Sequence, residues 1–584
     1  MTAPIIVNVR SWLAGYSQSL GLILAVLIFL VPLINYAIIS IRSQLRARNP
    51  GHGCHPPDIP YWIPFFGHIL SVAQDQSGFL RKITDRYGID IPVAVKIGPL
   101  TLYLLTTPEV FMGLTKTSEH LTPKPAIALA MKNIFGTHAA AGRIYMNDDS
   151  GISPKPLPGS TVSPINRIWF HQSSAARKYL SGSSLKTISE RFMEYLTAEI
   201  ARDKKTAGSN NEWVELPDLY EFWKDVVFVA ALNALYGPYL LKLNPQFIKD
   251  FWSYNAAIPT LMMGFPRWLT PGAYAARDRV LYSIKKWHRF ALEHSDVTNA
   301  APEWDEEWGS AYLKVRYNFR SPIEHMDADA HAADDLALLV AANANAVMCS
   351  AWFLLETVRE PGLIPKLLAE IESARKPGST SDLDIDVLCS QPLLQSMYAE
   401  TLRLRIGLMI NRTSQYHEVR IGPWKFPPNR PIAISSMAAA TNRRLWGDRD
   451  GERPLDEFWA ERFVLYPNDK RSGPWSAQRR AELGIDEKIA KGEINKPTFT
   501  MDGMSGGWIP YGAGEFMCPG RHLAKQEMVG SFAVFLDNYD VEALLPDGWV
   551  PEPDMRYFGT GALPPKKVVP FRIRRRVKTQ KKVE

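Results

Sequence analysis

The chain has 584 residues, of which 46% are hydrophobic and 22% charged, and its formal net charge is +7. This composition is that of an ordinary globular protein, and it argues against both a disordered chain and a multi-span membrane protein. The cysteines stand far apart without a C-x-x-C pair, which argues against a disulfide framework or a zinc ribbon and favours a reducing compartment. They are Cys54, Cys349, Cys389 and Cys518.

A long uncharged segment stands near the start of the chain. Residues 19–41 read SLGLILAVLIFLVPLINYAIISI and are long enough to cross about 30 Å of hydrocarbon as a helix. Arg42, Arg46 and Arg48 follow, and positive flanks of this kind stay on the cytoplasmic side. We therefore expect a transmembrane anchor over 19–41, a short lumenal N-terminus over 1–18, and a cytosolic remainder. The alternative for 19–41 is a buried core helix.

A proline-rich stretch, PPDIPYWIPFFGH, covers residues 56–68. Proline fixes φ and lacks an amide donor, so this stretch favours an extended, stiff connector. We expect residues 42–68 to form a basic flank and hinge that holds the following domain, residues 69–572, close to the bilayer.

The body of the chain is expected to be mainly α. VAVKIG and LTLYLLTT flank Gly98-Pro99 and predict one short hairpin. Helical periodicity dominates afterwards, and residues 333–360 are apolar on nearly every face. A helix that is apolar all round is buried, so 333–360 should run through the middle of the fold. Two polar insertions, residues 299–330 and 467–507, are expected to be surface excursions.

The loop WIPYGAGEFMCPGR, residues 508–521, contains the last cysteine. Gly512, Gly514 and Gly520 permit tight turns and close backbone approach, and Pro519 suits the first turn of a following helix. The Cys518 sulfur should then lie near a helix N-terminus, which favours the thiolate that binds metal or acts as a nucleophile. The alternative is an inert, buried cysteine.

This loop resembles the haem-thiolate signature of the cytochrome P450 monooxygenases, in which an aromatic residue, a glycine, the cysteine and a second glycine stand at fixed spacing. The matching residues are Tyr511, Gly514, Cys518 and Gly520. Phe516 departs from the pattern, because the family usually has a basic residue there that reaches a haem propionate. The resemblance implies the mainly α P450 fold, with a small N-terminal β region behind one transmembrane helix, and haem b with Cys518 as axial iron ligand.

Other residues agree with this resemblance. Glu400 and Arg403 stand three apart, on one helix face, and resemble the family's Glu-x-x-Arg pair. Arg462 in FWAERF resembles the arginine that joins this pair, with Ala460 in place of the family's proline. The resemblance implies a structural clamp under the haem; taken alone, the first two would be a solvent-facing pair. Arg412 corresponds by position to a propionate-binding arginine.

The central helix departs from the family's proton-relay motif. In AANANA, Ala344 stands where the family has an acid and Asn345 where it has threonine. This asparagine resembles the sterol 7α-hydroxylase and prostacyclin synthase branch. An amide can hydrogen-bond bound oxygen but cannot titrate near neutral pH, so proton delivery would depend on water or substrate. Two alternatives remain: a satisfied core polar residue, and an enzyme that rearranges a peroxide without a relay.

The resemblance implies a monooxygenase in the endoplasmic reticulum membrane that oxidises a steroid- or terpenoid-like substrate in secondary-metabolite biosynthesis. Its implied partners are NADPH–cytochrome P450 reductase and cytochrome b5, steered by basic residues such as Arg521 and Lys525. Residues 256–274 are expected to line the substrate entrance. The alternatives are a haem-thiolate isomerase or dehydratase that needs no reductase, and a non-catalytic haem-binding membrane protein.

The end of the chain, residues 573–584, is strongly basic. Such a tail is usually a solvated end, and attraction to anionic lipid or an acidic partner is the alternative. Nothing pairs this charge with aromatic stacking platforms, which argues against nucleic acid as a partner.

Overall fold

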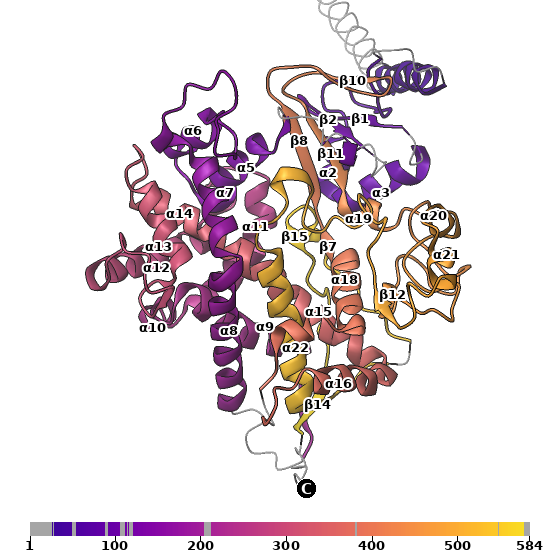
Figure 1. Ribbon diagram of the computed structural model, residues 1–584. Helices are drawn as coiled ribbons and strands as arrows, with labels where there is room; N and C mark the ends of the chain where they lie inside the picture. Colours follow the sequence, from indigo (N-terminus) through magenta and orange to yellow (C-terminus); the bar gives the residue numbers. More distant parts are fainter. Residues whose placement is uncertain are drawn as a thin grey trace, which may run out of the picture. The chain divides into compact units, whose positions relative to one another are not determined.

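The computed structural model describes residues 26, 29–48, 54–87, 91–105, 111–113, 115, 121–203, 212–379, 382–546 and 548–576. The chain forms two compact units, whose elements are labelled in Figure 1. The smaller unit comprises Met1–Thr122 and Ile410–Ala438, and the larger comprises Pro123–Met409 and Ala439–Glu584.

A five-stranded sheet of order β1-β2-β11-β8-β3 forms the smaller unit. The predicted hairpin is confirmed, because β1 pairs antiparallel with β2, and Gly98 takes a left-handed φ of +58° at their turn. The elements are β1 Val93–Ile97, β2 Leu100–Leu104, β3 Leu121–Thr122, β8 Met409–Ser414, β9 Val419–Ile421, β10 Trp424–Phe426, β11 Pro431–Ser435, α2 Ile69–Gln74, α3 Gln76–Tyr87 and α19 Ser436–Ala440, which runs into the larger unit.

The predicted membrane anchor is described only in part. Residues 1–25 and 27–28 lie outside the described residues, and with them the expected lumenal segment and the first part of the span. Residues 29–48 form one helix with exposed apolar side chains, among them Phe29 and Leu45. Asn35 Nδ2 donates to the Tyr61 carbonyl oxygen at 2.7 Å, which ties this helix to the proline-rich hinge.

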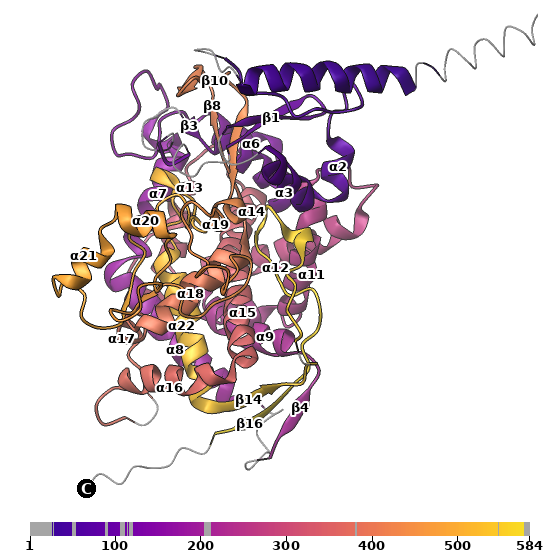
Figure 2. The same cartoon turned by 90° about the vertical axis from the view of Figure 1, so that its right-hand side faces the viewer.

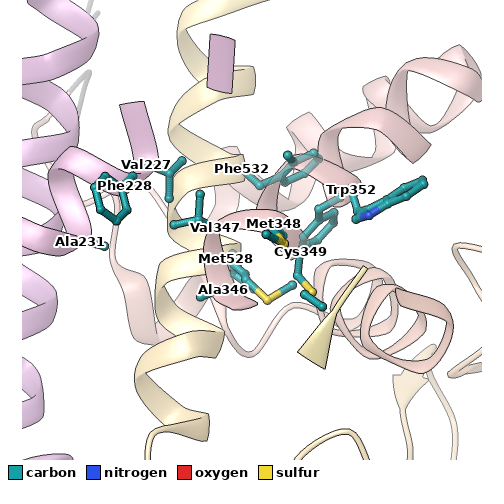
Figure 3. Close-up of a cluster of buried hydrophobic side chains, with 14 of the residues drawn as sticks. Val227, Phe228, Ala231, Ala346, Val347, Met348, Cys349, Trp352, Met528 and Phe532 are labelled. Atoms are coloured by element: carbon teal, nitrogen blue, oxygen red, sulfur yellow. The ribbon is translucent and has the colours of Figure 1, made fainter. Parts of the chain in front are cut away.

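Four long helices pack against one another in the larger unit: α8 Gly182–Arg202, α9 Leu219–Tyr236, α15 Asn345–Arg359 and α22 Arg521–Asn538 (Figure 1 and Figure 2). Figure 3 shows the apolar side chains that fill the space between α9, α15 and α22, among them Phe228, Met348 and Phe532. Phe532 also stacks on Phe353 of α15 with ring centroids 4.2 Å apart. Burial of these large apolar side chains is the main favourable term in folding.

Shorter helices surround this core, and small sheets cap it, so the predicted mainly α fold is confirmed. The remaining helices are α5 Lys124–Ala130, η1 Met131–Phe135, α6 Ala139–Asn147, η2 Pro164–Asn166, α7 Ile168–Tyr179, α10 Tyr239–Leu243, α11 Phe247–Met262, α12 Pro271–His294, α13 Ala311–Arg320, α14 Ala328–Leu339, η3 Val340–Ala344, η4 Pro361–Leu363, α16 Ile364–Ser373, α17 Ile385–Leu388, α18 Pro392–Arg405, α20 Ala477–Glu482, α21 Ile485–Ala490, η5 Gly514–Phe516 and η6 Met555–Tyr557. The strands are β4 Val214–Leu216, β5 Trp304–Asp305, β6 Gly309–Ser310, β7 Ile406–Gly407, β12 Val464–Leu465, β13 Thr498–Phe499, β14 Tyr539–Ala543, β15 Gly561–Ala562 and β16 Phe571–Arg575.

The predicted central helix is confirmed. α14, the π-helical turn η3 and α15 follow one another without a break from Ala328 to Arg359. Within the described part of the chain, this is the one helix long and apolar enough to cross a membrane by length and composition, and most of it is buried inside the protein. Its apolar character therefore reflects a position in the core.

The first polar insertion contains a buried ion cluster. Arg320 of α13 is fully buried, and its Nη2 donates to Asp335 Oδ1 at 2.8 Å. Arg316 and Arg320 both donate to Asp334, and His288 Nε2 lies 2.9 Å from Asp335 Oδ2. The prediction of a surface excursion is therefore wrong for residues 311–320. Charged side chains that look solvent-facing in the sequence instead neutralise one another in the core.

The second insertion folds around Arg480 of α20. This guanidinium is buried, and its Nε donates to Asp486 Oδ1 at 2.9 Å. Residues 491–498 are mostly exposed, as predicted for a surface excursion.

Candidate functional site

Cys518 ends a loop that turns sharply ahead of α22. Gly512 and Gly514 adopt φ angles of +76° and +69°, which L side chains rarely adopt. The Cys518 N–H donates to the Tyr511 carbonyl oxygen at 2.9 Å and closes the loop. α22 begins three residues after the cysteine, with Gly520 as its N-cap, so the predicted position of Cys518 next to a helix N-terminus is confirmed.

The groups around Cys518 shift the pKa of its thiol in opposite directions. Burial raises the pKa of the thiol, whereas the N–H groups of Gly520 and Arg521 and the Arg521 guanidinium lower it, and burial prevails. A bound metal cation deprotonates a coordinating thiol outright, so the two N–H groups would then face a thiolate. A Cβ at Gly520 would stand 3.9 Å from the sulfur, and glycine therefore leaves the space beside the sulfur open.

α18 holds the other end of the cysteine loop. The hydroxyl oxygens of Tyr511 and Tyr398 lie 2.7 Å apart, and Trp508 Nε1 donates to the Ala399 carbonyl oxygen at 2.9 Å. Burial raises the pKa of both tyrosines, so both stay neutral hydroxyls. The loop is therefore fixed to α18 by two hydrogen bonds at neighbouring residues.

Glu400, Arg403 and Arg462 meet in one cluster whose side chains are fully buried. Arg403 donates from Nε to Glu400 Oε2 at 2.6 Å and from Nη2 to Oε1 at 2.8 Å. Arg462 Nε and the Trp459 N–H both donate to Oε1, at 2.9 and 3.1 Å. One carboxylate thus accepts four hydrogen bonds, and the solvent-facing alternative is wrong.

Carbonyl groups satisfy other donors of this cluster. Arg403 Nη1 donates to the carbonyl oxygens of Ala440 and Leu455, each at 2.7 Å. Burial by itself would raise the pKa of Glu400, but Arg403 and Arg462 lower it overall. The carboxylate is therefore ionised, and residues 459–462 are joined to α18 through it. The position of this clamp under the haem stays a prediction.

One face of the central helix is open in the middle of the fold. Ala341 is exposed, and Ala342 and Asn345 are half-buried, whereas Asn343 and Ala344 between them are buried. The rest of this helix is mostly buried. A sulfur with open space beside it and an accessible, largely apolar helix face both fit an iron porphyrin and an apolar substrate.

Asn345 already has a hydrogen-bond partner within the protein. Its Oδ1 accepts from the Ala562 N–H at 2.8 Å, and no described residue accepts from its Nδ2. Ala344 offers only a methyl group, so neither residue carries a titratable proton. Their catalytic roles stay predictions.

Arg412 belongs to β8 of the smaller unit, whereas the residues above belong to the larger unit. Its side chain is almost fully buried, and its Nη1 donates to the Asn411 carbonyl oxygen at 2.8 Å. Burial lowers the pKa of this guanidinium to about 10. Its role as a propionate ligand stays a prediction.

Glu527 of α22 is a buried carboxyl that the sequence analysis did not identify. It is 3% exposed, and its Oε2 has no hydrogen-bond partner among the described residues. Burial raises its pKa to about 8, so the side chain is largely protonated at neutral pH. The available signal was its spacing of four from Leu523 and Ser531, which places it on a buried face of the helix.

Replacing Glu400 with glutamine should destabilise the folded protein by about 3–5 kcal/mol, because two buried guanidiniums lose their counter-charge. Equilibrium urea unfolding of E400Q and the wild type measures this difference. E194Q is the matched control, since Glu194 pairs with Arg191 in an exposed i,i+3 ion pair and its loss should cost less than about 1 kcal/mol. Equal effects of the two substitutions would contradict the assignment.

Replacing Glu527 with glutamine should stabilise the protein in a pH-dependent way. The folded pKa lies above the ordinary value, so the wild type loses stability as pH rises from about 4.5 to 8, by roughly 1.4 kcal/mol per pH unit, and E527Q does not. Melting temperatures at pH 5 and pH 8.5 test this expectation. The exposed control E190Q should show no such trend. If E527Q and the wild type differ in melting temperature by the same amount at both pH values, the expectation is wrong.

Replacing Cys518 with serine should abolish thiolate ligation of iron, because a hydroxyl is a poor substitute for a thiolate. The carbon-monoxide spectrum of the ferrous wild type should show the red-shifted Soret band of a thiolate ligand, and C518S should lack it. C389S is a matched control that should keep the band. An unchanged spectrum in C518S would show that another residue holds the iron.

No protein-family model matches the chain. It is 33% identical over 574 residues to cytochrome P450 monooxygenase fsoE of Humicola fuscoatra, with 95% of both chains covered. It is 34% identical over 547 residues to cytochrome P450 monooxygenase efuG of Hormonema carpetanum, with 91% of this chain and 92% of that relative covered. Cytochrome P450 7A1 of Oryctolagus cuniculus is 22% identical over 546 residues, with 91% and 95% covered.

These alignments extend over the cysteine loop, the buried Glu400 cluster and the central helix alike. The chain belongs to the cytochrome P450 family and is a haem-dependent monooxygenase.

Proposed function

We propose that this monooxygenase oxidises a hydrophobic, steroid- or terpenoid-like substrate in secondary-metabolite biosynthesis. The observation that carries the proposal is the accessible face of the central helix. Apart from Asn345, the partly accessible residues of 337–345 are apolar: Ala337, Leu338, Val340, Ala341 and Ala342. A wall of this kind binds a ligand by excluding water from apolar surface, with a single polar group to orient it.

A second apolar region supports a hydrophobic substrate. Met263, Phe265, Trp268 and Leu269 are exposed on the connection between α11 and α12. This connection lies within residues 256–274, the predicted substrate entrance. Exposed apolar clusters of this size mark a surface that meets lipid, a ligand or a partner, so a substrate that partitions into the bilayer would reach the enzyme here.

The haem, when bound, supplies the oxygen-activating iron chemistry. Cys518 would hold it by sulfur, with the N–H groups of Gly520 and Arg521 directed at that sulfur. The Asn345 amide offers a hydrogen-bond donor that does not titrate, so the proton for the reaction would come from water or from the substrate.

The proposed location is the endoplasmic reticulum membrane, with the catalytic domain in the cytosol. Its support is the long uncharged span at 19–41, the arginines that follow it, and the exposed apolar side chains of helix 29–48. Trp62 and Phe65 on the adjoining hinge are also exposed, the latter at 93%. Aromatic side chains of this kind are typical of the membrane–water interface.

Electrons are proposed to come from NADPH–cytochrome P450 reductase, with cytochrome b5 as a second donor. Of the two basic residues proposed to steer such a partner, Lys525 is largely occupied. Its Nζ donates to Gln395 Oε1 at 2.8 Å, and burial lowers its pKa. Arg521 is the better candidate, because only its Nη1 is engaged, with the Cys518 carbonyl oxygen at 3.1 Å.

The full-length protein in vesicles with reductase should oxidise a member of a steroid and cyclic-terpene panel, with turnover that requires NADPH, reductase and O2 together. Substrates are first selected by the haem difference spectrum, and products are then followed by mass spectrometry. The protein should float with the vesicles in a density gradient. Turnover of an oxygenated lipid without NADPH, reductase or O2 would support an isomerase or dehydratase. The absence of any spectral shift across the panel would contradict the proposed substrate class.

A further inference from the structure

One stripe of α15 faces the short sheet formed by β7 and β15. Asn345, Trp352 and Glu356 follow at spacings of seven and four, which places them on the same side of the helix. β15 pairs antiparallel with β7, so that Gly561 lies opposite Gly407 and Ala562 opposite Ile406. β7, β15 and α15 lie beside one another in Figure 1.

Each residue of this stripe bonds either to the sheet or to a residue that directly precedes or follows one of its two strands. Trp352 Nε1 donates to the Leu563 carbonyl oxygen at 2.6 Å. Glu356 accepts from Arg405, whose guanidinium lies 3.9 Å from the centroid of the Trp352 ring. The upper end of the stripe is Asn345, whose Oδ1 accepts from the Ala562 N–H at 2.8 Å.

Residues 552–566 double back as a hairpin, since the N–H groups of Asp554 and Lys566 donate to the carbonyl oxygens of residues 564 and 552. The hydrogen bonds at the tip of this hairpin, residues 559–563, explain why Asn345 is needed. The N–H groups of Gly559 and Leu563 donate to carbonyl oxygens of residues 407 and 405, at 2.7 and 2.9 Å. The Ala562 N–H points to the helix instead, in a position that is almost fully buried. Without Asn345 this donor would have no partner, and an unsatisfied buried N–H is costly.

Gly561 gives an independent sign of the same contact. A Cβ at this position would lie 2.1 Å from Asn345 Oδ1 and 3.0 Å from its Cγ. Its φ of +141° is also one that L side chains rarely adopt. The space that a side chain at 561 would fill is therefore the space that the asparagine amide occupies.

We propose that Asn345 is a positioning residue that fastens the hairpin tip, residues 559–563, to the central helix, and that position 561 is glycine because the Asn345 amide takes the place of a side chain. The tip is thereby held against the helix beside its accessible face, the face of Ala341 and Ala342. Position 345 consequently determines where one wall of the site stands.

The same bond fixes the direction of the asparagine amide. A backbone N–H requires an acceptor, so Oδ1 must face Ala562, and the Nδ2 group points elsewhere as a donor. Threonine at 345 could not replace this bond. Its oxygen is one bond closer to the backbone, and in a helix it tends to bond to a carbonyl of the preceding turn.

Hydrogen–deuterium exchange of the haem-loaded protein, resolved to single amides, tests the proposal. N345A and N345T should accelerate exchange of the Ala562 amide by about tenfold, which corresponds to the loss of one buried hydrogen bond. N345D keeps an acceptor at the same place and should retain protection. N343A is the matched control, since Asn343 is buried two residues away and bonds only to its own helix, at the Leu339 carbonyl.

Gly561 allows the same contact to be perturbed from its other side. G561A should displace the amide and expose the Ala562 N–H to exchange. In a double-mutant cycle scored by melting temperature, G561A should lower Tm less in the N345A background than in the wild type. If Ala562 exchange is the same in N345A, N345T and N343A, or if the Tm losses of N345A and G561A simply add, Asn345 does not hold the tip.

Discussion

The buried carboxylate of Glu400 is the contact on which the position of the cysteine loop depends. It accepts four hydrogen bonds from Arg403, Arg462 and the Trp459 N–H. Leaving either guanidinium without this carboxylate would place an unpaired charge in the core, at a cost of several kcal/mol. The helix that carries Glu400 is therefore fixed in position and in rotation relative to residues 459–462.

The cysteine loop is held in turn by two other residues of the same helix, α18. Tyr398 and Ala399 precede Glu400 directly, and they bond to Tyr511 and Trp508 of the cysteine loop. The Tyr511 carbonyl then accepts from the Cys518 N–H. An ion cluster without direct contact to the sulfur thus helps to determine where the sulfur stands, because the helix that carries it holds the cysteine loop by hydrogen bonds.

The sequence predicted those features whose partners lie close in the chain. Glu400 and Arg403 form an i,i+3 pair on a helix, and glycines 512 and 514 mark the turns of the cysteine loop. Features whose partners lie far away could not be read in this way. The amide that Asn345 bonds belongs to Ala562, 217 residues later, and no local pattern connects the two positions.

The first insertion shows the same limitation in another form. Arg316 and Arg320 sit in a polar stretch, and charge normally indicates a solvated surface. Their partners, Asp334 and Asp335, lie in α14 of the central helix, where the sequence gives no sign that two carboxylates are paired. Only the tertiary arrangement shows that the four charges cancel, and this cancellation is what permits their burial.

The choice of side chain at position 345 affects both the hydrogen bond to Ala562 and the supply of protons. A hydroxyl at position 345 would offer a mobile proton but would leave the Ala562 N–H without an acceptor. An amide satisfies that N–H and keeps its Nδ2 as a donor, but it cannot pass a proton on at neutral pH. On the proposal above, Asn345 and Gly561 together hold the hairpin tip in place, and the expected proton source is water or substrate. Changing either residue alone would disturb the position of the tip, whereas only a change at 345 would also alter the group available for proton transfer.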